Sequence, residues 1–213
     1  MNIPPIAYIA IACVAVGGAG YFGTKAATSS TTVIGQDRGH NLVSGKEQVK
    51  AALETLSPDL KTRYGKLKDL LQGRHWEEAD VETTERLLEA AGPEAFKRGF
   101  VEAQEMASLS MPDLQAVDTL WSAASHGRFG FAKQAYIYKN YAKGDWKRLY
   151  KLTAWQDLDG GPAISWDYDK IKGRYVVTRG LDPKFQQEGQ YPTFNRGYNT
   201  TVSLDSRLVQ VKF

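Results

Sequence analysis

The sequence predicts a mainly α-helical, compact domain with a small β element at its C-terminus, preceded by one N-terminal transmembrane helix. Three observations lead to this prediction. Apolar residues recur at helical spacing through most of the region between residues 45 and 152. The first 24 residues carry no charged side chain and include a long apolar run. Alternation with a period of two residues, which is typical of strands, appears only after residue 163.

The apolar run extends over residues 6–22 (IAYIAIACVAVGGAGYF) and predicts an uncleaved membrane span. As a helix it reaches roughly 26 Å, slightly less than a hydrocarbon core of ~30 Å. A cleaved secretory signal is the alternative, but no Lys or Arg precedes the run. Lys25 follows it, so the positive-inside rule predicts a single-pass membrane protein with its domain in the cytoplasm. An outward-facing domain would require the opposite orientation.

The chain divides into four segments, of which the first contains this apolar run. Residues 1–25 are assigned to the anchor, and residues 26–44, rich in Ser, Thr and Gly, to a flexible tether. Residues 45–192 form the helical domain, and residues 193–213 a β-rich tail. Helices of the domain are expected over residues 46–56, 58–73, 76–91, 94–107 and 146–152.

Between these helices, residues 113–141 predict two helices joined by a short reversal. Ser110 lies three residues before Asp113, as in a capping box. Gly127 is suited to the left-handed backbone conformation that ends a helix. The first helix has one apolar face, formed by Leu114, Val117, Leu120, Trp121 and Ala124. This arrangement predicts a packed helical hairpin and no catalytic site.

Near the C-terminus, the sequence predicts short strands. Residues 174–178 (RYVVT) are typical of a strand, whereas residues 164–171 alternate apolar and polar side chains only in part. Residues 200–213 alternate over Val202, Leu204, Val209, Val211 and Phe213, which predicts a hairpin or a paired strand.

Composition and motifs argue against an enzyme. The single Cys13 excludes an intrachain disulfide and a multi-cysteine zinc site, and a net charge of +3 gives no reason to expect nucleic-acid binding. The sequence contains no P-loop and no dinucleotide fingerprint. His75 is followed by Glu78 and Asp80, but these two carboxylates do not share a helix face, so a metal site is not predicted.

A catalytic triad is not predicted either. Ser125 and His126 are adjacent and point in different directions, and nothing in the sequence indicates an oxyanion site near Asp118. The chain is instead rich in aromatic residues, with five tryptophans between residues 76 and 166 and eleven tyrosines. Two interpretations remain open: these side chains pack in the core, or some of them form a surface for a flat ligand.

Two motifs carry a family resemblance. They are WEEADxxT at residues 76–83 and SxGRFGFxxQ at residues 125–134. With these motifs the chain resembles the genomes-uncoupled-four domain family, which comprises porphyrin-binding regulators of magnesium chelatase in chlorophyll synthesis. The resemblance covers roughly residues 60–192. Four residues that match the family, Trp121, Phe129, Phe131 and Gln134, are expected to build the scaffold.

The resemblance implies a non-catalytic regulator that binds protoporphyrin or magnesium-protoporphyrin and acts with a magnesium chelatase subunit. It implies no covalent cofactor and no metal ligands from the protein. A porphyrin site needs flat apolar walls and one or two cations for the propionates. The predicted walls are Trp155, Trp166, Tyr168 and Tyr175, and the predicted cations are Arg174 and Arg179, with Lys184 as a further candidate. Core packing of the tryptophans and a solvated strand edge for the arginines are the alternatives.

A second functional hypothesis follows from the divergent segment at residues 178–194 (TRGLDPKFQQEGQYPTF). Only its Gly189-Gln190-Tyr191-Pro192 stretch is similar to the family, although family members use this region to contact the porphyrin. The alternative is therefore a membrane-tethered interaction or sensor module of the same fold that no longer binds porphyrin.

Overall fold

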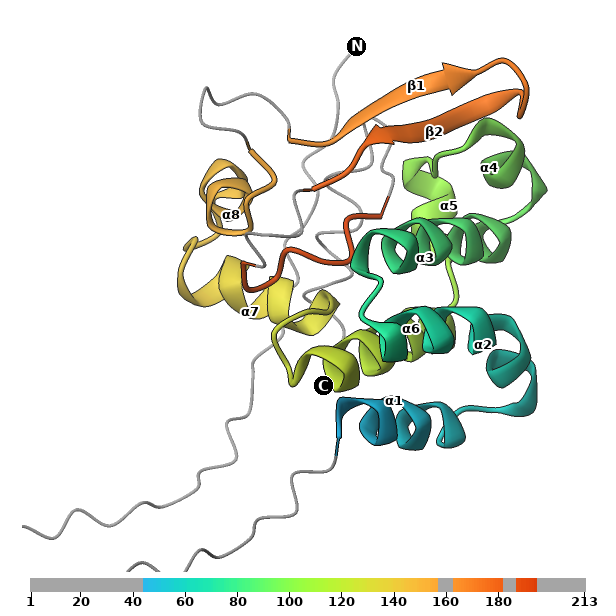
Figure 1. The fold of residues 1–213 in the computed structure, drawn as a ribbon. Coiled ribbons are helices and arrows are strands. Elements are labelled where there is room, and N and C mark those ends of the chain that lie inside the picture. The colour runs from blue at the N-terminus through green and yellow to red at the C-terminus, as the bar shows by residue number, and fades with distance from the viewer. Residues whose placement is uncertain (1–43, 157–162, 182–186, 195–213) are drawn as a thin grey trace, which may run out of the picture. The chain divides into compact units, whose positions relative to one another are not determined.

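A computed structural model describes residues 44–156, 163–181 and 187–194 of the chain (Figure 1). This part contains eight helices and one antiparallel pair of strands. In chain order they are α1 (Gly45–Glu54), α2 (Pro58–Gly73), α3 (Trp76–Ala91), α4 (Pro93–Arg98), α5 (Ala103–Ser108), α6 (Met111–Ser125), α7 (Phe131–Asn140), α8 (Trp146–Leu152), β1 (Ser165–Asp169) and β2 (Arg174–Arg179). The mainly helical fold with a small β element is therefore confirmed.

Helix α6 is the centre of the core, and α1, α2 and α3 pack against it (Figure 1). The apolar face predicted for it is confirmed, because all five of its residues are buried. The Ser110 side chain accepts a bond from the Asp113 N–H at the N-terminus of α6. At its C-terminus His126 adopts a left-handed conformation, and Gly127 continues it, so the chain reverses sharply into α7.

One predicted helix is wrong. Residues 94–107 were expected to form a single helix, but the structure divides them into α4 and α5. The break lies at Gly99, whose φ of +87° ends α4 in a left-handed conformation. The backbone of Tyr175 in β2 lies so close to Gly99 that a Cβ atom there would be 2.2 Å from the Tyr175 carbonyl oxygen. A contact with a distant strand therefore overrides the local helical pattern.

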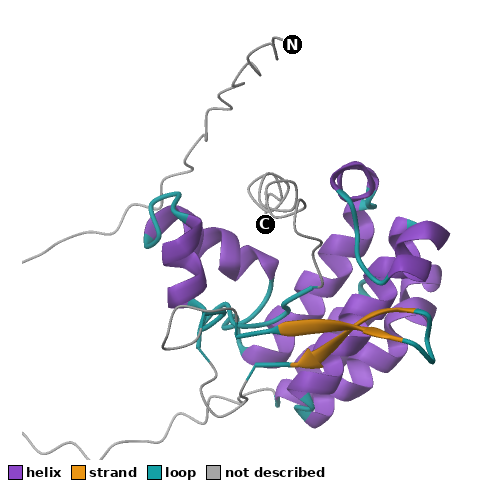
Figure 2. Cartoon of the chain, turned by 90° about the horizontal axis from the view of Figure 1, so that it is seen from above, coloured by secondary structure: helices purple, strands orange, loops and turns teal. Residues whose placement is uncertain are grey.

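The strand predicted at residues 174–178 is confirmed as β2, and its partner β1 comes from the stretch that alternates only in part. The two strands run across the helices beneath them when the molecule is seen from above (Figure 2). Strand β2 contacts α4. The hairpin formed by β1 and β2 is thus supported by α4.

Other predictions concern residues that the structure does not describe. The membrane span predicted at residues 6–22 and the strands predicted at residues 200–213 lie outside the described ranges, and the domain boundaries stay predictions. Within residues 44–156, 163–181 and 187–194, no helix combines the length and the apolar character that crossing a membrane requires.

Candidate functional site

The β1–β2 hairpin brings three of the predicted wall residues onto one face. In the register of the two strands, Trp166 pairs with Val177 and Tyr168 pairs with Tyr175. Directly paired residues share a face, as do residues two apart in a strand, so Trp166, Tyr168 and Tyr175 lie on the same side. The Tyr168 and Tyr175 rings meet edge to face with centroids 5.5 Å apart, and Tyr175 also meets Phe100 at 5.9 Å.

This aromatic face is partly open to solvent. Tyr168 is 54% exposed and Tyr175 is 44% exposed, whereas Trp166 is half-buried and packs against the core. Within the described residues, the Trp166 indole N–H is buried and has no hydrogen-bond acceptor. A buried donor without a partner destabilises a protein by about 1–3 kcal/mol, so an acceptor from a ligand or a water molecule would be favourable here.

Arg174, the first predicted cation, is already engaged by the protein. Its Nη2 atom lies 2.7 Å from each carboxylate oxygen of Glu85 in α3. Its guanidinium also lies 4.5 Å from the centroid of the Phe96 ring in α4, a cation–π contact. Arg174 therefore joins the hairpin to two helices, and a propionate would have to share it with Glu85.

The structure gives less information on the other two predicted cations, Arg179 and Lys184. The backbone of Arg179 pairs with Ser165 at the open end of the hairpin, and Lys184 lies outside the described residues. A lysine that the sequence analysis did not single out, Lys172, is exposed and lines a hollow of about 90 Å³ between α3 and β2. Its position beside Arg174 in the hairpin was the signal that could have identified it.

Trp155 does not belong to the aromatic face. It is buried, its indole N–H donates to the Gln190 carbonyl at 2.7 Å, and its ring meets Tyr150 edge to face. This geometry matches the core-packing alternative for Trp155. Its assignment as a porphyrin wall stays a prediction, and within the described residues its polar atom is satisfied by the chain itself.

The family motifs gather around the segment 187–194, which we call the C-terminal strap. The Gln134 side-chain amide donates to the carbonyls of Gly189 and Pro192, at 3.1 and 2.9 Å. The Gly130 N–H donates to the Tyr191 carbonyl at 2.9 Å. Within the described residues, Gln134 Oε1 is buried without a partner. The motif residues thus act mainly on the backbone of the strap.

Aromatic packing continues this arrangement. Tyr191 of the strap stacks on Trp121 with ring centroids 5.5 Å apart. Trp76 also stacks on Trp121, with ring centroids 6.0 Å apart. Phe129 meets both Trp121 and Tyr191 edge to face. The scaffold predicted for Trp121, Phe129, Phe131 and Gln134 is confirmed, since each of these side chains is at most 2% exposed.

Two buried carboxylates fix the ends of this scaffold. Asp80 accepts bonds from the Thr193 N–H at 2.7 Å and the Thr193 hydroxyl at 2.6 Å. Asp118 accepts a bond from the Ala132 N–H at the start of α7. Burial raises the pKa of each carboxyl to about 6, although the hydrogen bonds oppose the shift. Asp80 entered the sequence prediction only as a rejected metal ligand, and its contact with the strap was not predicted.

These raised pKa values predict a pH dependence of stability. The folded pKa of about 6 lies above the usual value of about 3.9 for Asp, so the folded state binds more protons between these pH values. Each carboxyl should therefore add about 1 kcal/mol to the free energy of unfolding as pH falls from 7 to 5. Asp80→Asn keeps an acceptor for the Thr193 N–H but removes the titration.

The measurement is urea unfolding of the wild type and Asp80→Asn between pH 5 and 7. We expect the wild type to gain about 1 kcal/mol over the variant on acidification. Glu77→Gln, at an exposed position at the start of α3, is the matched control and should follow the wild type. Parallel curves for the wild type and Asp80→Asn would contradict the prediction.

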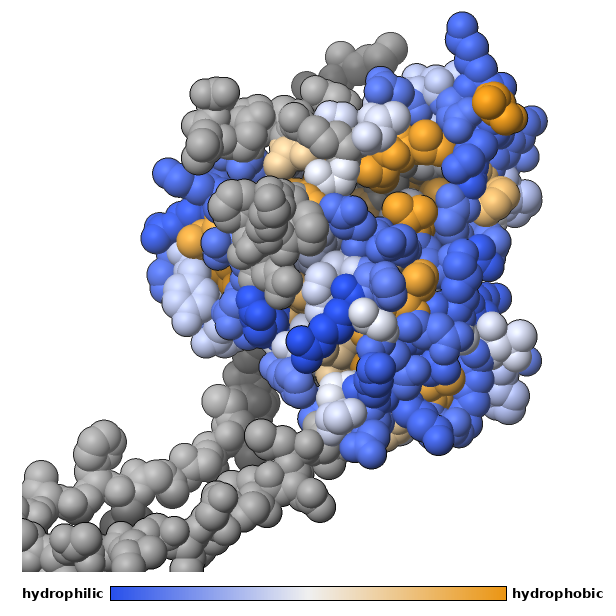
Figure 3. All heavy atoms as spheres, in the orientation of Figure 1, coloured by the Kyte–Doolittle hydropathy of each residue, from blue (hydrophilic) through white to orange (hydrophobic). Residues whose placement is uncertain are grey.

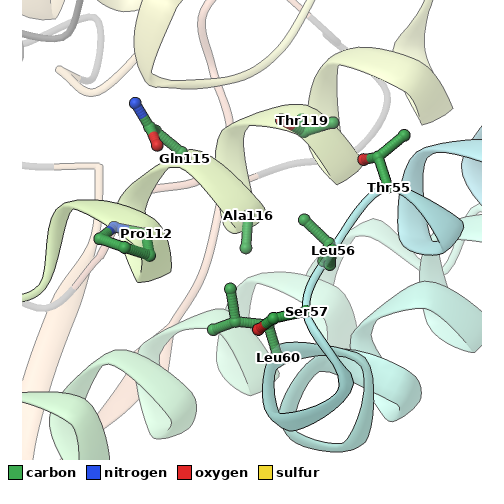
Figure 4. A pocket seen from close by; sticks show the side chains of 8 residues that line it. All are labelled: Thr55, Leu56, Ser57, Leu60, Pro112, Gln115, Ala116 and Thr119. Atoms are coloured by element: carbon green, nitrogen blue, oxygen red, sulfur yellow. The ribbon is translucent and has the colours of Figure 1, made fainter.

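A larger hollow lies at another place. It has a volume of about 360 Å³ and is formed by the α1–α2 turn and the first turns of α6 (Figure 4). Its lining residues are Thr55, Leu56, Ser57, Leu60, Pro112, Gln115, Ala116 and Thr119. It has the size of a small-molecule site, but its lining contains neither an aromatic ring nor a cation. It therefore lacks the groups that a flat dianionic ligand requires.

Comparison with known proteins places these features in context. A family model described as GUN4-like matches residues 57–177, which include the hairpin aromatic residues and exclude Arg179. The chain is 34% identical over 107 residues to the Arabidopsis thaliana protein "Tetrapyrrole-binding protein, chloroplastic", covering 50% of this chain and 40% of that protein. It is 29% identical over 126 residues to a Ycf53-like protein of Synechocystis sp., covering 55% and 52%. The chain thus matches only about two fifths to one half of these relatives' length.

Two solved structures share the fold. The structure of GUN4 from Chlamydomonas reinhardtii aligns with a TM-score of 0.62 and 27% identity, over 78% of this chain and 99% of that chain. The ligand-free structure of Arabidopsis thaliana GUN4 aligns with a TM-score of 0.51 and 27% identity, over 68% and 93%. The similarity therefore extends over most of the helical domain.

Proposed function

The chain belongs to the GUN4-like family, and from this premise we propose that it binds a tetrapyrrole on the aromatic face of its β1–β2 hairpin. The observation that carries the proposal is the grouping of Trp166, Tyr168 and Tyr175 on one side of this hairpin, within the range that matches the family. Two partly exposed rings, which meet edge to face, and a half-buried indole provide aromatic surface for a macrocycle. The Trp166 N–H, which has no acceptor among the described residues, offers a donor to a ligand oxygen.

The proposed ligand is protoporphyrin or magnesium-protoporphyrin. Lys172, at the edge of the hollow beside the hairpin, is suited to a propionate, whereas Arg174 directly precedes Tyr175 in β2, so by strand alternation it lies on the opposite face, bonded to Glu85. The Arabidopsis relative's name supports the ligand class, since it is a tetrapyrrole-binding protein. In magnesium-protoporphyrin the magnesium ion is already held by the macrocycle, so the proposed binding needs no metal ligand from the protein.

We further propose that the protein acts as a regulator rather than a catalyst, in partnership with a magnesium chelatase subunit in chlorophyll synthesis. Support for this comes from the family membership and from the resemblance of the two motifs. The apolar run at residues 6–22 would tether the domain to a membrane, with the domain on the cytoplasmic side. The plastid location in the Arabidopsis relative's name concerns that protein.

The test is a fluorescence titration of residues 41–213, a piece that retains every described contact. Deuteroporphyrin and its magnesium form should quench tryptophan emission in a saturable manner. Tyr168→Ala should weaken binding about tenfold, because it removes one stacking ring. Trp166→Phe should also weaken it, since the ring is kept while the donor is lost. Tyr141→Ala is the matched control, because Tyr141 is 53% exposed at the end of α7.

Quenching that is absent from a protein with a wild-type circular dichroism spectrum would contradict tetrapyrrole binding. Equal weakening by Tyr168→Ala and Tyr141→Ala would contradict the hairpin site. Arg174→Ala is unsuitable as a binding test on its own, since the loss of the Glu85 and Phe96 contacts changes the support of the hairpin. Its effect on stability should be measured first.

A second candidate function is favoured by the pairing of Arg174 with Glu85. Glu85 already binds the cation that a propionate would need. In addition, the hollow beside the hairpin has a volume of only about 90 Å³, below the ~300 Å³ typical of small-molecule pockets. The protein would then be a membrane-tethered interaction or sensor module of the same fold without porphyrin binding. Folded protein that shows no quenching with either porphyrin, but recovers a defined partner, would support this alternative.

A further inference from the structure

The tip of the β1–β2 hairpin carries an apolar side chain with no role in the fold. Ile171 is 98% exposed, the largest exposure among the large hydrophobic residues of the described chain. Gly, Pro, Asn, Asp and Ser dominate turns, so a large apolar residue at a turn is unusual. Single exposed apolar residues are common on protein surfaces, so Ile171 becomes informative only through its surroundings.

The first of these surroundings is a rigid turn. The Asp169 side chain accepts bonds from the N–H groups of Ile171 and Lys172, at 2.8 and 3.1 Å, and the Asp169 carbonyl accepts the Gly173 N–H at 2.8 Å. Gly173 has the positive φ of +65° that closes the turn. Ile171 is thereby held outward, and the negative charge of Asp169 is directed at backbone N–H groups.

The second is the order of side chains from the tip toward the core. Lys170 and Lys172, both exposed, flank Ile171, and the partly exposed rings of Tyr168 and Tyr175 follow behind them. The surface around the tip is otherwise mostly hydrophilic (Figure 3). An aliphatic tip, then cations, then tyrosines is the sequence of groups that matches the depth profile of an anionic lipid surface.

The third feature is the set of contacts that hold the hairpin on the helices. Arg174 bonds to Glu85 in α3 and stacks on Phe96 in α4, and Tyr175 packs against Phe100. These contacts fix the hairpin, and with it the tip, on the helical core. A hairpin of this kind presents its end residue to a partner without unfolding, as a surface-inserting loop must.

We propose that the hairpin tip formed by residues 170–172 inserts Ile171 into an anionic lipid surface, with Lys170 and Lys172 on the headgroups. The proposal rests on the membrane tether proposed for residues 6–22. Residues 23–43 span at most roughly 70 Å when fully extended, so the proposed anchor would hold the start of the domain within that distance of the bilayer. A tether raises the effective concentration of the tip at the surface, so even a weak contact fixes the orientation of the domain.

The experiment uses the full chain reconstituted into vesicles, with the single native Cys13 replaced by Ser and Ile171→Cys labelled with an environment-sensitive nitrobenzoxadiazole dye. Flotation that withstands high salt establishes the anchor independently. In vesicles of phosphatidylcholine mixed with phosphatidylglycerol, the label at position 171 should show blue-shifted emission and protection from an aqueous quencher. In pure phosphatidylcholine both effects should be much smaller, because the lysines lack anionic partners.

Two variants complete the test. The same dye at Tyr141→Cys, an exposed position at the end of α7, should remain water-exposed in both lipids. Lys170→Glu with Lys172→Glu should lower the protected fraction about tenfold or more, since each basic residue near an anionic surface contributes roughly fivefold. A water-exposed label at 171 in anionic vesicles, from chains that float, would overturn the proposal and leave the tether intact. Equal protection in neutral lipid would also overturn it.

Discussion

Trp121→Ala should lower the free energy of unfolding by about 3–5 kcal/mol, the range found when large aromatic side chains are removed from a core. Trp121 is completely buried, and its ring contacts those of Trp76, Phe129 and Tyr191. Its indole N–H donates to the Thr83 hydroxyl at 2.9 Å, which itself donates to a backbone carbonyl of α3. The substitution therefore leaves both a cavity and a buried hydroxyl without its donor.

The measurement is urea unfolding of residues 41–213 followed by circular dichroism. Because Tyr191 belongs to the C-terminal strap and stacks on Trp121, amide exchange in the strap should increase together with the loss of stability. The exposed Tyr141→Ala is the control and should change stability by no more than about 0.5 kcal/mol. A loss below about 1 kcal/mol for Trp121→Ala would show that the aromatic cluster does not support the core.

The helical elements were predictable because their signals are local. The N-caps at Ser110 and Asp145 depend on residues within one turn of each helix start, and the apolar face of α6 depends on side chains that recur about once per turn. The Asp145 carboxylate accepts from the N–H groups of the second and third residues that follow it, as expected for an N-cap. Such patterns need no knowledge of distant parts of the chain.

The site depends on contacts that no local pattern contains. Arg174 was predicted as a cation for a propionate, but its partner Glu85 lies 89 residues earlier in the chain, and no local pattern indicates that the two residues pair. Asp80 bonds to Thr193, which is 113 residues away. In contrast, the grouping of Trp166, Tyr168 and Tyr175 followed from strand periodicity once the hairpin register was known.

The family-like residues of the C-terminal strap are explained by their backbone contacts. Gly189-Gln190-Tyr191-Pro192 was identified as the family-like part of a divergent segment, and its residues are buried. The structure explains the similarity by backbone bonds, because Gln134, Gly130 and Trp155 each bond to its carbonyls. These bonds constrain the path of the chain more than the chemistry of a ligand, so the motif indicates the fold before it indicates a function.

Gly99→Ala should be the most damaging substitution of a small residue near the hairpin. Gly99 has a φ of +87°, and an added Cβ atom would lie 2.2 Å from the Tyr175 carbonyl oxygen and 2.9 Å from its nitrogen. Neither backbone atom can move without shifting β2. We expect the free energy of unfolding to fall by at least about 3 kcal/mol, of which a left-handed conformation alone accounts for about 1–2 kcal/mol.

Gly127→Ala separates these two contributions. Gly127 also has a positive φ, +75°, but no atom lies within 4 Å of the position of its Cβ, so the variant carries the conformational strain without the clash. Unfolding measurements should therefore place Gly127→Ala between the wild type and Gly99→Ala. Amide exchange should rise in β2 only for Gly99→Ala, and this variant alone should lose the aromatic face and with it tetrapyrrole binding. If the two variants were equally destabilised, with β2 protected in both, the docking of the hairpin on α4 would not depend on the absent side chain of Gly99.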